Sequence, residues 1–232
     1  MHASQHAHRS SRGFSLVELL TVIAIISVLA GLAGYGISRA RASAKNSVCS
    51  SNQRQIAVAI LMASQDNRGI FPPSHNDAGI AWTTNLESYF GDKKSQILVC
   101  PSRSFDPPNA SEYWQASYSL NPRIMADLYN EPPRQVRVAS VPRPSEVILV
   151  ADGGLRPSGA AQGRFWQVDT AGQSNPWLGG ANLVIADGPD VDDGTACFRF
   201  RHEGKLNVAF ADGHVGSFEK GTIRQRNLHI AY

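Results

Sequence analysis

The chain has 232 residues, 42% of them hydrophobic, which is enough to bury a substantial core in one or two domains. Its 22 Lys and Arg against 19 Asp and Glu give a formal net charge of +3, which argues against nucleic acid as a partner. The mean hydropathy of -0.22 excludes a protein with many membrane spans but leaves room for one.

The N-terminal region contains one strongly apolar segment. Twenty consecutive residues, from Leu19 to Ser38, carry no charge. As a helix they would extend about 30 Å, the thickness of the hydrocarbon core of a bilayer. Three interpretations follow: a cleaved secretory signal peptide with its cut among the small residues 30–34, a permanent membrane anchor, or an anchor with special processing.

Glu18 distinguishes among these interpretations because it lies at the start of the apolar run. A carboxylate costs roughly 2.5–3.5 kcal/mol at the centre of a bilayer and less near its interface. A signal peptide needs only hydrophobicity here, so a retained charge calls for a compensating cation from a partner. The alternative is an interfacial Glu, tolerated by snorkelling or by protonation.

Residues 13–18 read GFSLVE, and LLTVIAIISVLA follows them. This pattern resembles the N-terminus of type IV prepilins and type II secretion pseudopilins. The resemblance implies that a prepilin peptidase cleaves between Gly13 and Phe14 and methylates the new amine of Phe14. It also implies that Glu18 pairs with the N-terminal amine of a neighbouring subunit, a registry role for a buried ion pair.

The same resemblance implies partners and a location. The partners are the prepilin peptidase, other pilin or pseudopilin subunits, an inner-membrane assembly platform and membrane lipid. The location is a single pass through the bacterial inner membrane, with the globular domain outside the cytoplasm and assembly into a periplasmic or surface fibre. Basic residues flank both ends of the span, so charge alone leaves the orientation open.

The helical pattern continues past the span. Apolar and small residues recur at steps of three and four from Val48 to Ala63, and residues 66–69 read DNRG, a stop signal before two prolines. We therefore expect one helix from Phe14 to about Asn67. Three glycines near its midpoint predict a place where the helix bends or melts, or where neighbouring helices pack closely; they are Gly31, Gly34 and Gly36.

The fold class that we predict is α+β, with a long helix packed against an antiparallel, pilin-like sheet domain. The expected organisation is a leader at 1–13, a transmembrane or filament-core helix at 14–38, a helical stalk at 39–67 and a β-rich domain at 68–232. Candidate strands lie at Gln96–Cys100, Glu146–Ala151, Phe165–Val168, Leu183–Ala186 and after Ala196.

The C-terminal region predicts a three-stranded meander over 196–219. Three-residue loops at 202–204 and 211–213 would connect its strands. A two-residue loop at 203–204 is rejected because it would oppose Phe200 to Asn207 instead of an apolar residue. The second turn stays open: a two-residue loop would pair Phe210 with Val215, and a three-residue loop would pair Leu206 with Phe218.

His202, nine intervening residues and then Asp212-Gly213 resemble the H-x9-DG signature of prepilin-type processing-associated proteins. In the meander these residues would lie at opposite ends of one strand, about 20 Å apart, so they could not share a metal ion. We interpret them as polar turn residues. Three runs also end in Ala-Asp-Gly, at Asp152, Asp187 and Asp212, and we favour Asp-Gly turns over a repeated site.

Two further features carry weaker chemistry. The acidic loop of Asp187, Asp190, Asp192 and Asp193 is the best cation candidate, with calcium as its ion, and a solvated acidic turn is the alternative. None of the three cysteines stands in a C-x-x-C pair, so the sequence offers no zinc knuckle. Cys49 and Cys100 could form a disulfide that tethers the stalk to the domain, or the cysteines could stay free.

The function that we expect is structural and not enzymatic. No G-x-S-x-G, H-E-x-x-H or P-loop motif is present, and no catalytic residue is assigned. The alternative is a membrane-anchored binding module whose four tryptophans recognise a secreted substrate or glycan; they are Trp82, Trp114, Trp166 and Trp177. Removal of residues 1–13 would leave 20 basic and 19 acidic residues, so the basic character belongs partly to the leader.

Overall fold

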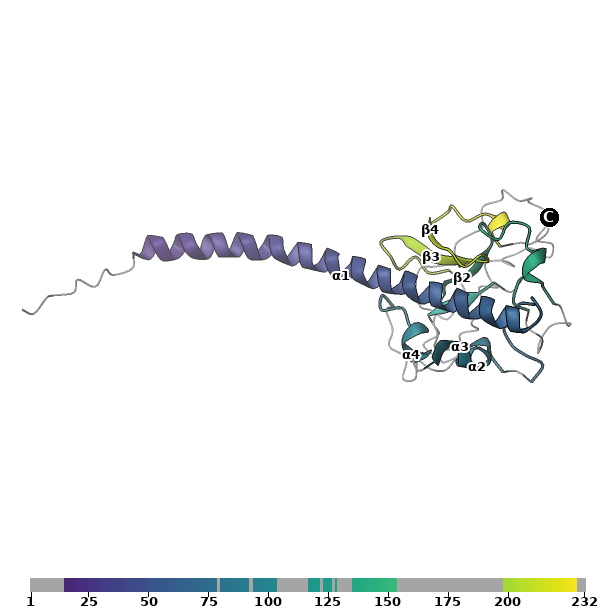
Figure 1. Ribbon diagram of the computed structural model, residues 1–232. Coiled ribbons are helices and arrows are strands. Elements are labelled where there is room, and N and C mark those ends of the chain that lie inside the picture. Colours follow the sequence, from purple (N-terminus) through teal and green to yellow (C-terminus); the bar gives the residue numbers. More distant parts are fainter. Residues whose placement is uncertain are drawn as a thin grey trace, which may run out of the picture. The chain divides into compact units, whose positions relative to one another are not determined.

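The computed structural model describes residues 15–78, 80–91, 94–103, 117–121, 123–126, 128, 135–153 and 198–228. Within them a long helix is followed by a four-stranded antiparallel sheet, which confirms the predicted α+β class (Figure 1). The chain divides into two compact units, Met1–Arg41 and Ala42–Tyr232. The predicted strands at 165–168 and 183–186 lie outside the described residues.

Helix α1 spans Leu16–Asp66, so the expected single helix is confirmed to within two residues at its N-terminal end and one at its C-terminal end. It ends where Arg68 and Gly69 take positive φ values of 56° and 76°, and the Gly69 N–H donates to the carbonyl of Ser64. The helix continues through the three midpoint glycines, so the prediction that it melts there is wrong for the single chain. Close packing at those glycines stays a prediction.

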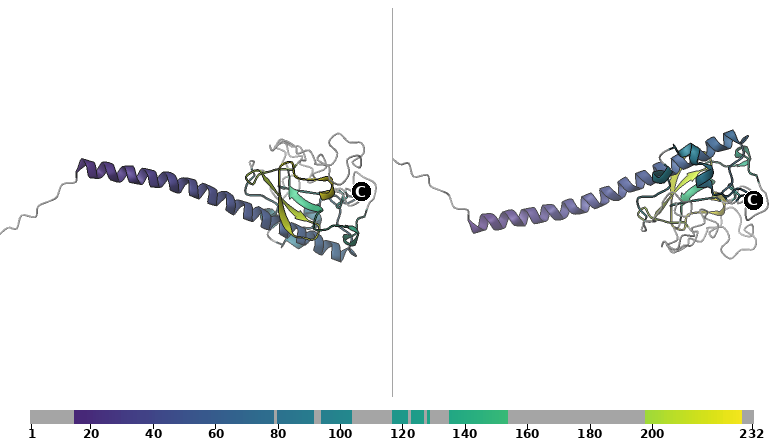
Figure 2. Two further views of the ribbon diagram at one scale, coloured as in Figure 1. Left: turned by 90° about the horizontal axis from the view of Figure 1, so that it is seen from above. Right: turned by 90° about the horizontal axis from the view of Figure 1, so that it is seen from below.

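The C-terminal part of α1 buries one face, as the periodicity predicts. Its buried apolar residues are Cys49, Ile56, Ala57, Ala59, Ile60 and Ala63. Val48, which the pattern placed on this face, is exposed instead. Asn52 and Gln53 are buried on the same face, and their amides form bonds that the pattern does not reveal. Figure 2 shows this part of α1 beside the strands.

Three one-turn helices follow: α2 (Trp82–Asn85), α3 (Glu87–Phe90) and α4 (Lys94–Ile97). The strand predicted at 96–100 is therefore wrong. The Asn52 side-chain amide donates to the carbonyls of Gln96 and Val99, at 3.3 and 3.0 Å, and the Leu98 carbonyl accepts from the N–H of Ser117. The backbone carbonyls of this segment therefore accept hydrogen bonds from α1 and from the loop before β1, and not from a neighbouring strand.

The sheet has the order β1-β2-β3-β4, and every pair is antiparallel. Its strands are β1 (Tyr118–Leu120), β2 (Ile148–Asp152), β3 (Lys205–Phe210) and β4 (Val215–Glu219). Two short 3-10 helices, η3 (Val138–Ser140) and η4 (Gln225–Asn227), complete the regular elements of the described residues. The predicted strand at 146–151 is confirmed as β2, shifted by one or two residues.

The predicted meander is wrong in its first strand. Phe198 forms a bridge with Gly153, and β3 takes β2 as its neighbour instead of residues 196–201. The turn before β3 is also the one that the sequence argument rejected: His202 pairs with Lys205 around Glu203 and Gly204, whose φ values are 54° and 78°. Positive φ at both central residues is the geometry of a type I′ hairpin turn.

The second turn is the three-residue loop, because Leu206 pairs with Phe218 and the Phe210 N–H donates to the His214 carbonyl. Gly213 closes this loop with a φ of 88°, which glycine adopts without a steric cost.

The two faces of the sheet are covered by different partners. On one face Leu149, Val150 and Ala209 join the buried face of α1 in one core cluster. On the other face, alternate residues of β3 pack against residues that lie before β3 and after β4 in the sequence. This second cluster contains Leu206, Val208 and Phe210 of β3 together with Phe198, Phe200, Ile223 and Leu228. Because of this alternation, Asn207 points toward α1 and becomes available to the site described below.

Gly153 provides a test of how closely β1 and β2 approach. A Cβ at this position would lie 1.8 Å from Oγ and 2.8 Å from Cβ of Ser119. Gly153→Ala is expected to lower the free energy of unfolding by about 1–3 kcal/mol, the usual cost of overpacking. Urea unfolding of the full-length chain in detergent, followed by tryptophan fluorescence, measures this. Adding Ser119→Gly should recover part of the loss, and an unchanged midpoint for Gly153→Ala would contradict the packing.

Candidate functional site

The N-terminal site begins at the first turn of α1. Gly13 and Phe14, the predicted cleavage and methylation residues, lie outside the described residues. Glu18 is exposed, and its Oε2 accepts a hydrogen bond from the backbone N–H of Ser15 at 2.9 Å. This is one half of a capping box, in which a Glu three residues after the helix start returns to the capping residue. In the single chain Glu18 therefore stabilises its own helix terminus.

The apolar side chains on both sides of Glu18 in the sequence are all exposed. Leu16 is 75% exposed, Leu32 69% and Tyr35 72%, and no residue of α1 before Cys49 is buried. By length and composition α1 could cross a membrane, although a signal sequence or a soluble core helix meets the same criteria. Its N-terminal part is apolar on every side, which is typical of a helix surrounded by lipid or by other helices and not by water.

The two halves of the H-x9-DG pattern lie in different surroundings. His202 is 4% exposed, and its Nε2 lies 3.2 Å from Oδ2 of Asp152 and 3.7 Å from Sγ of Cys100. Asp212 stands in the exposed turn after β3, where its Oδ1 lies 2.6 Å from Nδ1 of His214. Asp212 is thus a turn residue as interpreted. His202 is instead part of a buried polar cluster, so the interpretation of it as a simple turn residue is incomplete.

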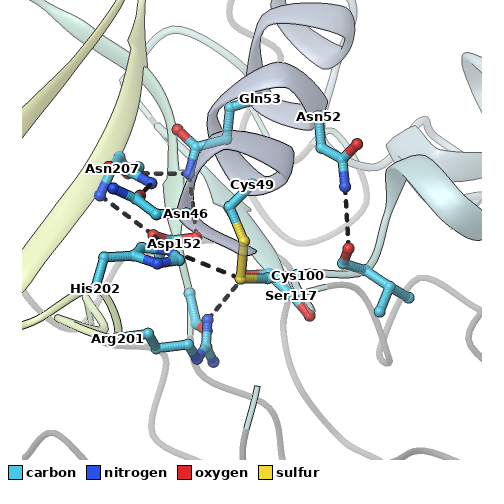
Figure 3. The surroundings of a disulfide bond; sticks show 12 residues. Asn46, Cys49, Asn52, Gln53, Cys100, Ser117, Asp152, Arg201, His202 and Asn207 are labelled. Atoms are coloured by element: carbon cyan, nitrogen blue, oxygen red, sulfur yellow. Dashed lines mark hydrogen bonds and ion pairs between the residues drawn. A yellow bond between two sulfur atoms is a disulfide. The ribbon is translucent and has the colours of Figure 1, made fainter. Parts of the chain in front are cut away.

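Cys49 and Cys100 form a disulfide that joins α1 to the loop after α4 (Figure 3). The Cα atoms are 5.2 Å apart, and both residues are fully buried. This is the pairing that the sequence left as one of its alternatives. Cys197, the third cysteine, lies outside the described residues.

Asp152 is the central residue of the buried cluster, and sequence reasoning missed it by treating it as a turn residue. It lies in β2 with no exposed surface. Its Oδ1 accepts from Nε2 of Gln53 at 3.1 Å, and its Oδ2 accepts from the backbone N–H of Asn207 at 3.2 Å. The Gln53 side-chain amide also donates to the backbone carbonyl of Asn207. The side-chain amide of Asn207 in turn donates to the side-chain oxygen of Asn46 in α1.

The sequence signal that could have revealed Asp152 was a glutamine on the buried face of the helix, together with an Asp at the end of a strongly apolar run.

We name the group of Cys49, Cys100, Asp152 and His202 the disulfide cluster. Its four side-chain donor atoms all lie within 4.8 Å of one another, and all four residues are buried. Sulfur, imidazole and carboxylate are also the usual ligands of zinc in proteins. Among the described residues the structure therefore brings together His202 and both predicted cysteines, and it keeps Glu18 and Asp212 outside this cluster.

The surroundings of Asp152 change the chemistry of Tyr118, its partner in the β1–β2 pairing. Burial raises the pKa of the Tyr118 hydroxyl well above its usual value, and the Asp152 carboxylate raises it further. Both causes oppose the formation of a phenolate. The folded chain therefore holds this proton at a pH where the unfolded chain releases it.

The raised pKa of Tyr118 predicts that the folded chain loses stability at alkaline pH. Because its pKa is raised in the folded state, its contribution is complete below the ordinary tyrosine pKa of about 10 and declines above it. The decline approaches about 1.4 kcal/mol per pH unit. Urea unfolding between pH 8.5 and 11 should show a steeper loss for the wild type than for Tyr118→Phe. Parallel pH curves for the two proteins would contradict this assignment.

The other predicted sites are outside the described residues or are occupied by packing. The acidic loop of residues 187–193 and three of the four tryptophans lie outside the described residues. Trp82 has no exposed surface and packs edge-on against Phe90 in the core, so it offers no binding surface.

Comparison with known proteins identifies the N-terminal segment. A family model described as the prokaryotic N-terminal methylation motif matches residues 8–34, which include Gly13, Phe14, Glu18 and more than half of the apolar run. Neither a search of curated proteins nor one of solved structures finds a match to this chain. The matched motif is a structural, pilin-type one and not the motif of an enzyme. It supports a prepilin-type family and indicates that the chain is a precursor of the type IV pilin or pseudopilin kind.

Proposed function

We propose that this chain is a structural subunit that a prepilin peptidase cleaves between Gly13 and Phe14 and that then assembles into a fibre. The fibre is of the type II secretion pseudopilus or type IV pilus class. The observation that carries the proposal is the methylation motif at 8–34, which overlaps the start of a helix that has no buried residue before Cys49. A motif that marks processing is thus joined to a surface that has no partner within the described residues of the chain.

The exposed apolar helix supplies the driving force for membrane insertion and for assembly. Each large aliphatic side chain that moves out of water contributes about 1.5–3 kcal/mol. At least a dozen such side chains between Leu16 and Ile37 are exposed by 46% or more. Lipid covers them before assembly, and the helices of neighbouring subunits cover them in the fibre. In this proposal the chain is anchored by one span, and residues 42–232 lie outside the cytoplasm.

Glu18 sets the register between subunits. Among the described residues its carboxylate accepts a hydrogen bond only from Ser15, and a neutral amide could accept this bond as well. Cleavage after Gly13 would create a positively charged amine on Phe14. A carboxylate in an apolar fibre core needs such a cation, because an unpaired buried charge costs several kcal/mol. The amine of a neighbouring subunit provides it at one axial position only.

The cleavage can be tested directly. The chain is co-expressed with a prepilin peptidase, and the N-terminus of the product is determined by mass spectrometry. The expected product begins with N-methylated Phe14 and has lost the first 13 residues. An uncleaved chain, or a cut after Ala33 by a signal peptidase, would overturn the proposal. Gly13→Leu should block the cut while leaving the helix unchanged.

The pairing role of Glu18 needs two matched variants. Glu18→Gln keeps an acceptor for the Ser15 N–H but removes the charge, whereas Glu18→Ala removes both. We expect both to be cleaved and both to lose most of the subunit cross-linking seen with the wild type, because the charge is what pairs with Phe14. Cross-linking in intact cells followed by immunoblotting measures this. Loss in Glu18→Ala alone would assign Glu18 to helix capping, and unchanged cross-linking in both would remove the pairing role.

The binding-module alternative receives no support from the part of the chain that the structure describes. Trp82, its only described tryptophan, is buried. The proposed function therefore rests on the N-terminal segment, and in the proposed fibre the globular unit lies on the outer surface.

A further inference from the structure

The disulfide cluster contains more chemistry than a disulfide needs. A disulfide is neutral and packs well among apolar side chains, yet here a carboxylate and an imidazole are buried beside it. Burial of a carboxylate is costly unless partners compensate it. The four donor groups come from α1, from the loop after α4, from the end of β2 and from the turn before β3, as Figure 3 shows.

We propose that, when Cys49 and Cys100 are in the thiol form, this cluster is a zinc site with Cys49, Cys100, His202 and Asp152 as its ligands. The zinc-loaded dithiol and the disulfide are then two alternative states of one site. The inference concerns the globular unit and does not depend on the proposed assembly into a fibre.

Two of the six distances between the four ligand atoms fit a tetrahedral ion. Zinc binds thiolate sulfur at about 2.3 Å and nitrogen or oxygen at about 2.0–2.2 Å, which places neighbouring ligand atoms about 3.3–3.8 Å apart on a tetrahedron. Nε2 of His202 is 3.2 Å from Oδ2 of Asp152 and 3.7 Å from Sγ of Cys100. These two edges already have nearly the required lengths. The sulfur–sulfur edge is a covalent bond, and it must be reduced before both sulfurs can bind the ion.

The carboxylate is already oriented by neighbours that would remain in place. Gln53 donates to Oδ1 and the Asn207 N–H donates to Oδ2, so both oxygens are fixed relative to α1 and β3. Such outer contacts orient metal ligands and strengthen metal binding by about 10–100-fold. They also leave Oδ2 on the side of His202, where it can bind an ion.

A cavity lies beside one of the four ligands. It has a volume of about 140 Å³, and His202 lines it together with Asn46, Arg201 and Glu203. That volume is large enough to hold several water molecules, and in this proposal a hydrated ion enters it and exchanges its waters for protein ligands.

An oxidant that is itself a disulfide can convert the zinc-bound dithiol into the Cys49–Cys100 disulfide. One zinc-bound thiolate attacks the oxidant R–S–S–R, forms a mixed disulfide and releases one RS⁻. The second thiolate displaces the second RS⁻ and forms the Cys49–Cys100 bond. Two electrons pass from the protein sulfurs to the oxidant, and Zn²⁺ leaves because two of its four ligands have gone. A dithiol reductant reverses the exchange.

The test uses the full-length chain in detergent, with the disulfide reduced by a phosphine under argon. Competition with a chromophoric chelator then measures zinc binding. We expect one Zn²⁺ per reduced chain and none per oxidised chain. His202→Ala should weaken binding by at least about tenfold. His202→Cys should restore it by supplying a different zinc ligand, and Cys197→Ser, the matched cysteine control, should leave it unchanged.

Two measurements keep the test decisive if the reduced chain does not fold. Zinc should restore its near-ultraviolet circular dichroism in the wild type but not in His202→Ala, because binding to an assembled site promotes folding. Zinc should also protect Cys49 and Cys100, but not Cys197, from alkylation. Absence of zinc binding by the reduced chain, equal binding by His202→Ala, or equal protection of all three cysteines would overturn the proposal.

Discussion

The attachment of α1 to the sheet depends on Asp152. Its carboxylate is fully buried between the helix and β3, and it accepts one hydrogen bond from each. A charge in this position is stable only when its partners stay in place, and removal of one partner of a buried charge typically costs 3–5 kcal/mol. The Cys49–Cys100 bond lies beside it and joins residues 51 positions apart. In the chain-entropy account a loop of that length contributes about 4 kcal/mol.

This attachment divides α1 into two stretches with opposite requirements. From Leu19 to Ser38 the helix buries no residue, and its composition is apolar on all sides. From Cys49 onward one face is buried, and that face mixes apolar residues with Asn52 and Gln53. An apolar face would hold a helix against a sheet at several registers, whereas buried amides accept only one set of partners. The polar residues thus define the position of the helix on the sheet, and the apolar stretch before them is left for lipid and for other subunits.

Features set by neighbouring residues could be predicted from the sequence, and those set by distant ones could not. The apolar span, the helix end at Arg68 and Gly69 and the turn at Asp212 all follow from contiguous residues. Asp152 depends on Gln53 and Asn207, which lie 99 and 55 positions away, and no local pattern records such partners. The first strand of the meander failed for the same reason. Phe198 pairs with Gly153, far from it in the sequence, and the turn at Glu203 takes the tighter two-residue form.

The spacing between His202 and Asp212 has a structural explanation in these terms. The nine intervening residues are the two central residues of the first turn, the six residues of β3 and Ala211. An insertion or deletion in β3 would move every following side chain to the opposite face of the sheet. His202 must stay at the buried end beside Asp152, while the turn with Asp212 and Gly213 must stay exposed at the other. Between these two ends, β3 carries Asn207 on the side that faces α1, and the Asn207 backbone N–H donates to the Asp152 carboxylate. A constant separation therefore preserves the polar cluster, the strand and the exposed turn together.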